Sequence, residues 1–263
     1  MRGGLPMAIG GGGGIVGVIV LLLALFAGGG GTESLQLGTG AENDLSDECQ
    51  TGADANQRDD CRIVAVVNSL QEHWGETIRN YQPAQTVLFS GSVATACGNA
   101  TSAVGPFYCP ADTTVYIDLS FYDELRSRFG ANGGPFAEAY VIAHEYGHHV
   151  ENLLGVLERA RDGSTGPASS GVRVELMADC LAGVWARHAV DTELVEAISD
   201  QDIADGLDAA AAIGDDRIQE QVQGQVQPEL WTHGSAQQRQ TWFTTGYREG
   251  TVQDCDTFAV ATP

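Results

Sequence analysis

Residues 139–155 read AYVIAHEYGHHVENLLG and contain three of the six histidines of this 263-residue chain. Within them lies the pattern HExxH, from His144 to His148. Because an α-helix turns by about 100° per residue, these two histidines lie one turn apart on one face, and both imidazoles can reach one metal ion. Glu145 projects to the side, where it can hold a water molecule on the ion. The motif therefore predicts a metal site on a helix spanning 135–154.

Two ligands do not complete such a site, because catalytic zinc usually keeps three protein ligands and one open position. A third ligand is predicted in SSGVRVELMADCLAGVWARHA, residues 169–189, where Glu175 and Asp179 stand four residues apart on one helix face. Their neighbours are apolar, and a buried carboxylate pair without partners would be costly. We therefore expect Glu175 to bind the metal and Asp179 to accept the other N–H of a ligand histidine, namely His144.

The rest of the chain predicts an α+β fold, mostly helical, with a small sheet preceding the HExxH helix. Short β-type runs occur at 86–90 and 114–120. Helical periodicity marks five segments and a further region: 59–80, 121–129, 135–154, 170–189, 235–246, and parts of 192–222. The run TVYIDLS (114–120) is either an edge strand that holds an extended peptide by backbone pairing or an ordinary core strand.

The first 58 residues differ in composition from the rest. Residues 5–31 carry no charge and include the apolar run IVGVIVLLLALFA, with Arg2 before it. We expect residues 1–31 to be a single-pass membrane segment with a cytoplasmic N-terminus. A cleaved signal peptide is the alternative. Residues 32–58 are polar and acidic, which predicts a flexible linker, and residues 59–263 form the globular domain. In either case this domain lies outside the cytoplasm.

Cysteine usage agrees with an exported chain, because an even number of cysteines in such a chain indicates disulfides. The six cysteines form none of the CxxC pairs of a cysteine zinc site. The most economical pairing is Cys49–Cys61, Cys97–Cys109 and Cys180–Cys255. The first two would close short loops, and the third would tie the C-terminal region to the middle of the domain.

The formal net charge is −22, and all 13 cationic residues are arginines. Such a surface repels nucleic acid and anionic lipid, so neither is an expected ligand. The charge weakly favours neutral or cationic substrates.

HExxH followed by ExxxD on a later helix resembles the gluzincin arrangement of thermolysin-like peptidases. More closely, the chain resembles a bacterial family of membrane-anchored neutral zinc metallopeptidases. The resemblance covers most of residues 60–258 and rests on these stretches: TACG, GPFYCPADTTVYIDLSFYDEL, AYVIAHEYGHHV, VELMADCLAGVWA, AIGDDRIQ and THGSAQQR…WFTTGYREG…CDTF. It implies a zincin-like domain with one catalytic zinc ion, which hydrolyses peptide or protein substrates with Glu145 as general base.

His233, in THGS, lies outside the metal motifs. It is either a hydrogen-bond donor to the oxyanion or part of a structural, helix-capping segment. We expect His149 to face away from the metal, and His73 and His188 to be structural or on the surface.

Three functions are compatible with this predicted zinc site. The first is a zinc peptidase, in particular an endopeptidase, of the cell envelope. The second is a catalytically silent zinc-binding scaffold at the membrane, and the third is a zinc amidase on a non-protein envelope substrate. Glu145 favours an enzyme, because a structural zinc site needs no general base.

Overall fold

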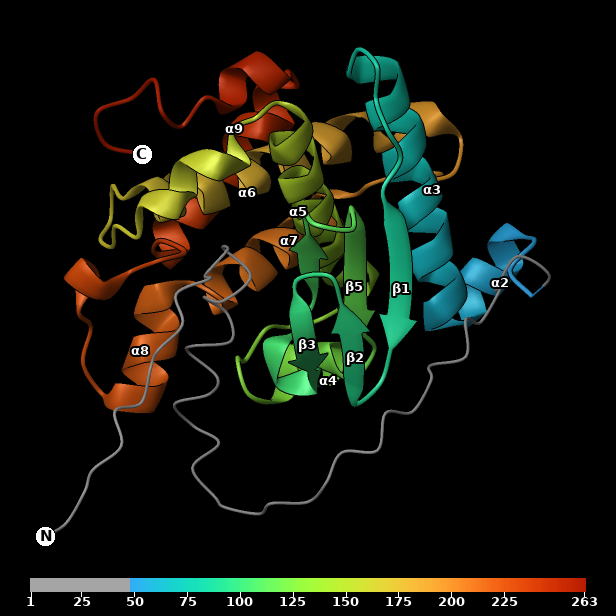
Figure 1. The fold of residues 1–263 in the computed structure, drawn as a ribbon. Helices are drawn as coiled ribbons and strands as arrows, with labels where there is room; N and C mark the ends of the chain where they lie inside the picture. Colours follow the sequence, from blue (N-terminus) through green and yellow to red (C-terminus); the bar gives the residue numbers. More distant parts are fainter. Residues whose placement is uncertain (1–47) are drawn as a thin grey trace, which may run out of the picture.

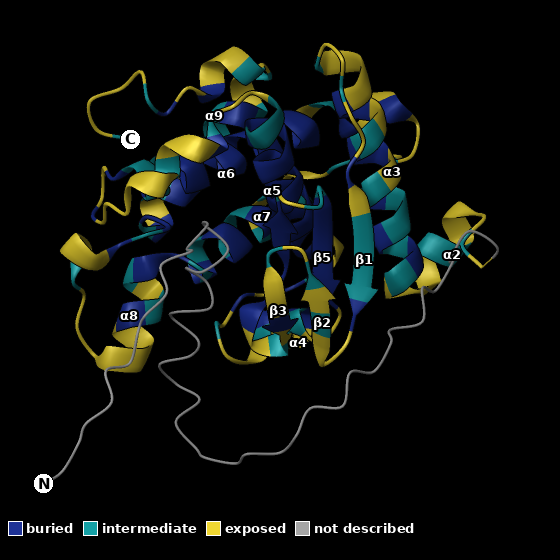
Figure 2. Cartoon of the chain, in the orientation of Figure 1, coloured by how far each residue is buried: buried dark blue, intermediate teal, exposed yellow. Residues whose placement is uncertain are grey.

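Helix α5 (Pro135–Leu153), which carries the HExxH motif, lies at the centre of the domain (Figure 1). The computed structural model describes residues 48–263; the expected membrane segment and most of the predicted linker lie outside the described residues. Nearly every residue of α5 is buried (Figure 2), including the two histidines of the HExxH motif. Pro135 begins the helix, where its missing N–H costs nothing.

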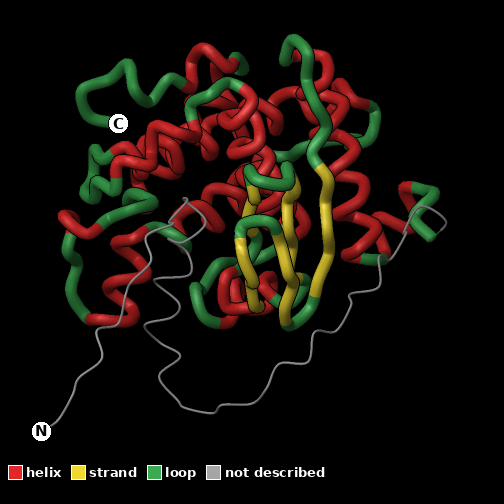
Figure 3. Tube along the Cα trace, in the orientation of Figure 1, coloured by secondary structure: helices red, strands yellow, loops and turns green. Residues whose placement is uncertain are grey.

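Helices predominate over strands (Figure 3), as expected from the sequence. In chain order the α-helices of residues 48–263 are α2 (Gly52–Gln57), α3 (Asp59–Thr77), α4 (Phe121–Ser127), α5, α6 (Ser170–His188), α7 (Asp200–Ala212), α8 (Asp215–Gln223) and α9 (Ala236–Glu249). Helix α9 continues past Gly246, where the prediction ended it, and stops at Gly250, whose φ of 77° is left-handed. The α+β class and the small sheet ahead of α5 are confirmed.

A three-stranded sheet packs against α5. Its strands are β1 (Gln85–Phe89), β5 (Thr114–Asp118) and β4 (Phe107–Cys109), in the order β1-β5-β4. Strand β5 pairs parallel with β1 and antiparallel with β4, and all five of its residues are buried. The reading of 114–120 as an edge strand is therefore wrong, because β5 is paired on both sides. The strands at the two edges of this sheet are β1 and β4, and β4 has only three residues, too few to show a strand pattern in sequence.

Strands β2 (Ser92–Thr95) and β3 (Gly98–Thr101) form a separate antiparallel hairpin. A disulfide between Cys97 in its turn and Cys109 in β4 ties the hairpin to the edge strand. Successive side chains of β4 point to opposite faces of the sheet. Phe107 and Cys109 pack in a small apolar cluster with the hairpin, whereas Tyr108 packs in the main core. Both faces of β4 are therefore packed against other parts of the domain.

Helices α6 and α9 cross at very short range. A Cβ atom added to Gly246 of α9 would lie 1.8 Å from the carbonyl oxygen of Cys180, and one added to Gly183 of α6 would lie 2.1 Å from that of Phe243. Only glycine permits backbones to approach so closely. The disulfide between Cys180 and Cys255 joins α6 to the segment after α9. Two helices that are far apart in sequence thus form one rigid layer.

The last part of the predicted flexible linker differs from the expectation, because Gly52–Gln57 form helix α2. Thr51 and Asp54 cap it reciprocally, and a disulfide joins Cys49 to Cys61 at the start of α3. This Thr-x-x-Asp capping box is visible in the sequence and outweighs the polar composition around it. Among the helices of residues 48–263, none has the length and apolar character needed to cross a membrane.

Candidate metal centre

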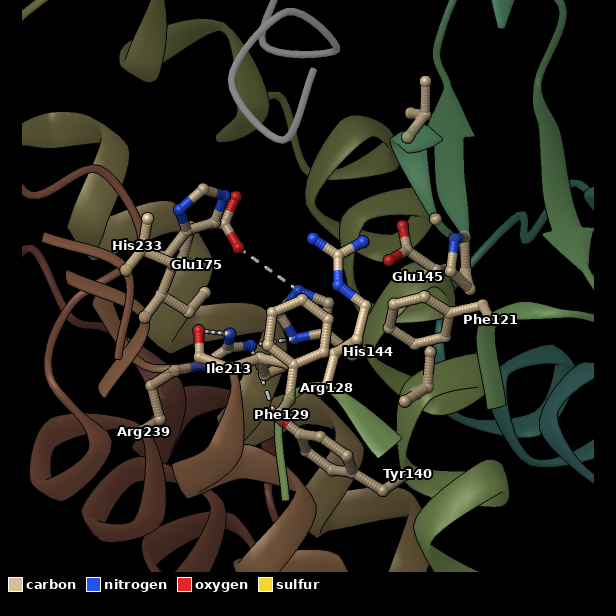
Figure 4. Close-up of a pocket in the computed structure, with 16 residues that line it drawn as sticks. Phe121, Arg128, Phe129, Tyr140, His144, Glu145, Glu175, Ile213, His233 and Arg239 are labelled. Carbon is tan, nitrogen blue, oxygen red and sulfur yellow. Dashed lines mark hydrogen bonds and ion pairs between the residues drawn. The ribbon is translucent and has the colours of Figure 1, made fainter. Parts of the chain in front are cut away.

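Three donor groups from α5 and α6 meet at one buried point. The Nε2 atom of His144 lies 3.3 Å from Oε2 of Glu175, and Nε2 of His148 lies 3.7 Å from Oε1 of the same carboxylate. One donor atom from each of the three residues lies within 4.8 Å of the others, and all three side chains are buried. Figure 4 shows two of them, His144 and Glu175. The structure thus brings together the three residues that the sequence proposes as metal ligands.

The two helices can approach because small residues face each other where they touch. A Cβ atom on Gly147, inside the HExxH motif, would lie 2.8 Å from the Cα atom of Ala178 on α6. A larger residue at either position would push α6 away and carry the Glu175 carboxylate with it. The glycine of the motif therefore sets the distance between the histidines and the glutamate.

The second nitrogen of each histidine is also held. Nδ1 of His144 donates to Oδ1 of Asp179 at 2.8 Å, the partner that the sequence reading expects. Nδ1 of His148 is hydrogen-bonded to Oε2 of Glu151 at 2.8 Å. Such partners fix ring orientation and leave Nε2 free for a metal ion. Glu151 was not among the predicted site residues, although its position three residues after His148 places it on the same helix face.

Asp179 also binds a buried arginine. Nε and Nη2 of Arg239, on α9, donate to Oδ2 and Oδ1 of Asp179 at 2.8 and 2.9 Å, and the hydroxyl of Tyr140 donates to Oδ1. Burial would raise the pKa of Asp179, but the charges of Arg239 and His144 outweigh it and lower that pKa. Asp179 is therefore a carboxylate that fixes the orientation of His144.

Arg239 is the second residue of the site that was not predicted from the sequence. Its side chain is 3% exposed, a rare environment for arginine unless it is paired. A weak signal existed, because Trp242 and Phe243 follow at helical spacing and predict an inward-facing stripe of α9. The ion pair spans 60 residues of sequence.

Glu145 lines the same cavity as His144 and Glu175 but is not part of the donor cluster. Burial raises its pKa to about 7, with the His144 and Arg239 charges lowering it and the Glu175 charge raising it further. A carboxyl group with a pKa near neutrality can both accept and release a proton under physiological conditions. Its place beside the donors and its pKa suit a general base.

His233 lies in the cavity wall, beside Glu175 in the view of Figure 4. Asp215, at the start of α8, accepts the backbone N–H groups of Thr232, His233 and Gly234 at 2.7, 2.7 and 3.0 Å. Nδ1 of His233 lies 3.3 Å from the other oxygen of Asp215. Burial lowers the pKa of His233, but the charges of Glu175 and Asp215 raise it overall. Asp215, which the sequence analysis did not single out, fixes this loop and the ring.

The other histidines have structural contacts. His149 is buried and bonds the carbonyl of Gln82 through Nε2 at 2.7 Å and the hydroxyl of Tyr108 through Nδ1 at 3.1 Å, so it faces away from the metal donors. His73 and His188 stack on each other with ring centroids 5.4 Å apart. Neither belongs to the donor cluster.

The cavity beside the donors has a volume of about 90 Å³. Its wall away from the metal donors is mainly apolar and comes from α4, α5, α8 and the segments beside them: Val104, Pro106, Phe121, Phe129, Val141, Ile213, Ile218 and Val222. Such a mainly apolar cavity with a few convergent polar groups is typical of a small-molecule or side-chain binding site.

The donor set fits zinc. Two imidazole nitrogens and one carboxylate oxygen are the ligands of many catalytic zinc sites, in which a fourth position stays open. Burial would raise the pKa of Glu175, but the charges of His233, His148 and His144 hold it well below its usual value, so the carboxylate is ionised. Because both Nδ1 atoms are hydrogen-bonded, the Nε2 atoms are the ones that would bind an ion.

A helical α+β domain in which an HExxH helix and a glutamate of a following helix meet at one buried point is the architecture of zincin-like metallopeptidases. The chain belongs to the family described as "Putative neutral zinc metallopeptidase", whose model matches residues 1–258. This confirms the resemblance inferred from the sequence motifs.

Relatives occur in distant bacteria. An uncharacterized protein of Mycobacterium tuberculosis is 54% identical over 225 residues, which span 83% of this chain and 76% of the relative. A protein of Mycobacterium bovis has the same identity and coverage. The uncharacterized protein YpfJ of Escherichia coli is 44% identical over 202 residues, 73% of this chain and 69% of the relative. No solved structure matches the chain.

Proposed function

We propose that the protein is a zinc-dependent peptidase, in particular an endopeptidase, of the cell envelope. The observation that carries the proposal is the buried His144–His148–Glu175 donor set, with Glu145 in the same cavity. Zinc bound there would polarise a peptide carbonyl and lower the pKa of a water molecule toward neutrality. A site that only held zinc for stability would need no carboxyl group of near-neutral pKa beside it.

Glu145 acts as the general base. Its carboxylate takes a proton from the attacking water and passes it to the leaving amine when the C–N bond breaks. With a pKa of about 7, the group is suited to both halves of this transfer. Asp179 and Glu151 keep the two histidines oriented throughout.

His233 stabilises the negative charge that develops on the carbonyl oxygen. Nδ1–H of His233 donates to Asp215, and the nearby carboxylates raise the pKa of His233 and so favour the protonated ring. In that form Nε2–H can also donate, into the cavity that His233 lines. A donor fixed before the reaction lowers the barrier without reorganisation.

Edge strand β4 and the cavity bind the substrate. Strand β4 is paired only with β5 among residues 48–263, and the backbone of Tyr108 lies close enough to the Glu145 carboxyl group to lower its pKa. An extended peptide added to this free edge would run past Glu145. One of its side chains would enter the apolar cavity, which favours a bulky apolar residue next to the scissile bond.

The envelope location rests on the sequence. Residues 1–31 read as a membrane segment that leaves the domain outside the cytoplasm, or as a cleaved signal in a secreted form. The three disulfides agree with an oxidising compartment.

The test uses the full chain in detergent, loaded with zinc, and a peptide library read by mass spectrometry. Wild type should cleave, and Glu145→Gln should bind zinc stoichiometrically and cleave nothing. Glu72→Gln changes an exposed glutamate of α3 and serves as the control that keeps activity. Stoichiometric zinc without Glu145-dependent cleavage of any peptide would contradict the proposal. That result would favour the silent scaffold, or an amidase if envelope amides are cleaved instead.

A further inference from the structure

A cation lies in the wall of the cavity. Arg128, at the C-terminal end of α4, lines the cavity together with Glu145, Glu175 and His233. In the view of Figure 4 its guanidinium projects toward the space between the two glutamates. The other arginine of the wall, Arg239, is buried and fully engaged with Asp179 and Tyr140. Arg128 is therefore the cavity arginine that a ligand can reach.

Most of the donors of Arg128 are free. Nη1 donates to Oε2 of Glu124 at 3.2 Å, and within residues 48–263 the guanidinium makes no other hydrogen bond. The two side chains are 49% and 30% exposed, and an exposed pair of this kind contributes only about 0–1 kcal/mol. A planar guanidinium with free N–H groups matches a carboxylate, which it can bind through two parallel hydrogen bonds.

The position of this cation is informative because the chain is so acidic. With 35 acidic residues and 13 arginines, most of the surface repels an anionic ligand. Arg128 lies beside the apolar side chains of Phe129 and Phe121, which line the same cavity. The wall thus combines an apolar surface with one accessible positive charge. A ligand that satisfies both carries an apolar group and, next to it, a carboxylate.

We propose that Arg128 is a specificity-determining residue, which binds a carboxylate of the peptide whose apolar side chain occupies the cavity. The inference rests on the proposed peptidase function and adds the substrate class to it. The carboxylate has two sources, a free C-terminus one or two residues beyond the scissile bond or the side chain of a neighbouring Asp or Glu. Arg128 thus provides a local positive charge for an anion in a chain whose overall negative charge disfavours anions.

Two pairs of peptides test the proposal with the full-length zinc-loaded protein. The first pair differs only in a C-terminal carboxylate or carboxamide, placed one or two residues after a cleaved bond. The second pair is amidated and differs in Glu or Gln beside the apolar residue. At least one pair should show a preference for the carboxylate of roughly ten- to a hundred-fold in kcat/KM, expressed mainly in KM. The pair that shows it identifies the source.

Arg128→Gln should abolish this preference and leave cleavage of the uncharged peptide unchanged, and Arg128→Lys should restore part of it. Arg126→Gln is the matched control, because it removes the same charge two residues away, from a side chain that pairs with Asp123 and Glu138 outside the cavity. The preference should survive in that control. Absence of any carboxylate preference in wild type, or an equal loss for both members of a pair in Arg128→Gln, would overturn the proposal.

Binding separates failure of this inference from failure of the proposed function. Zinc-loaded Glu145→Gln should bind the carboxylate peptide more tightly than its uncharged partner in fluorescence anisotropy, and addition of Arg128→Gln should remove the difference. If wild type cleaves no peptide but this difference exists, the peptidase proposal fails and the Arg128 proposal stands. If wild type cleaves peptides but neither assay shows a preference for the carboxylate peptide, the Arg128 proposal fails and the peptidase proposal stands.

Discussion

The ion pair between Arg239 and Asp179 allows the strongest test of the site's architecture. Arg239→Met keeps an unbranched apolar side chain, shorter than that of arginine, and removes the charge and its hydrogen bonds. Asp179, which is fully buried, would then keep only His144 and Tyr140 as partners. Because removal of one partner leaves a buried charge uncompensated, we expect the free energy of unfolding of the metal-free protein to fall by about 3–5 kcal/mol.

The assay is urea unfolding of the metal-free, disulfide-intact protein, followed by circular dichroism. Arg161→Met is the matched control, since Arg161 likewise pairs with a carboxylate, that of Glu158, but these two side chains are 55% and 72% exposed. Its loss should cost less than about 1 kcal/mol. The double variant Asp179→Asn, Arg239→Met should recover part of the lost stability, because no charge is left unpaired.

Zinc affinity gives an independent readout. Since Arg239 holds the Asp179 carboxylate that orients His144, zinc affinity measured by competition with a chelator should fall roughly ten- to a hundred-fold in Arg239→Met. If Arg239→Met unfolds within about 1 kcal/mol of wild type and binds zinc equally well, the network does not support the site and the reasoning is refuted.

Three further predictions follow from single residues. His233→Ala should lower kcat by roughly a hundred- to a thousand-fold with zinc retained, if it donates to the oxyanion; unchanged turnover would exclude that role. Gly246→Ala should cost about 2 kcal/mol or more in urea unfolding, because its Cβ would lie 1.8 Å from the Cys180 oxygen. Gly75→Ala in α3, whose Cβ would meet only Tyr81 at 3.9 Å, is the control that should be neutral or stabilising. Burial, with a smaller contribution from His188, lowers the pKa of His73 to about 4 from its ordinary value of 6.5. The unfolded chain therefore binds this proton first, so stability is full above pH 6.5 and falls toward pH 4, by up to about 3 kcal/mol in total. His73→Phe should flatten that part of the stability profile, and an identical profile in the variant would contradict the assignment.

The sequence was sufficient where the pattern is local. The helical period through His144 and His148 and the apolar neighbours of Glu175 predicted both helices of the site within one residue at each end. The class of fold and the family followed from the same stretches. A motif on one helix has a fixed geometry, so its spacing in the sequence predicts how its side chains lie relative to one another.

Contacts between residues that are far apart in the sequence produce no regular spacing from which they could be predicted. The pairing of Arg239 with Asp179 depends on a helix crossing that two glycines permit, and neither glycine reveals its partner in the sequence. Gly246 even suggested the end of a helix, because glycine terminates helices as readily as it allows close packing. The prediction of 114–120 as an edge strand failed for a related reason. All five residues of β5 are buried, which gives this segment a clear strand pattern, but the pattern does not show which strands pair with it.

The distance in sequence between Asp179 and Arg239 has a consequence for biosynthesis. Ribosomes make the chain from its N-terminus, so α5 and α6 emerge while α9 has still to be translated. During that interval the Asp179 carboxylate has His144 beside it but lacks Arg239, the larger of its two cationic partners, so the two helices bury it at a greater cost. The metal centre is therefore completed only when nearly the whole domain has been synthesised, and a prematurely terminated chain would present α6 with an exposed apolar face to quality-control proteases.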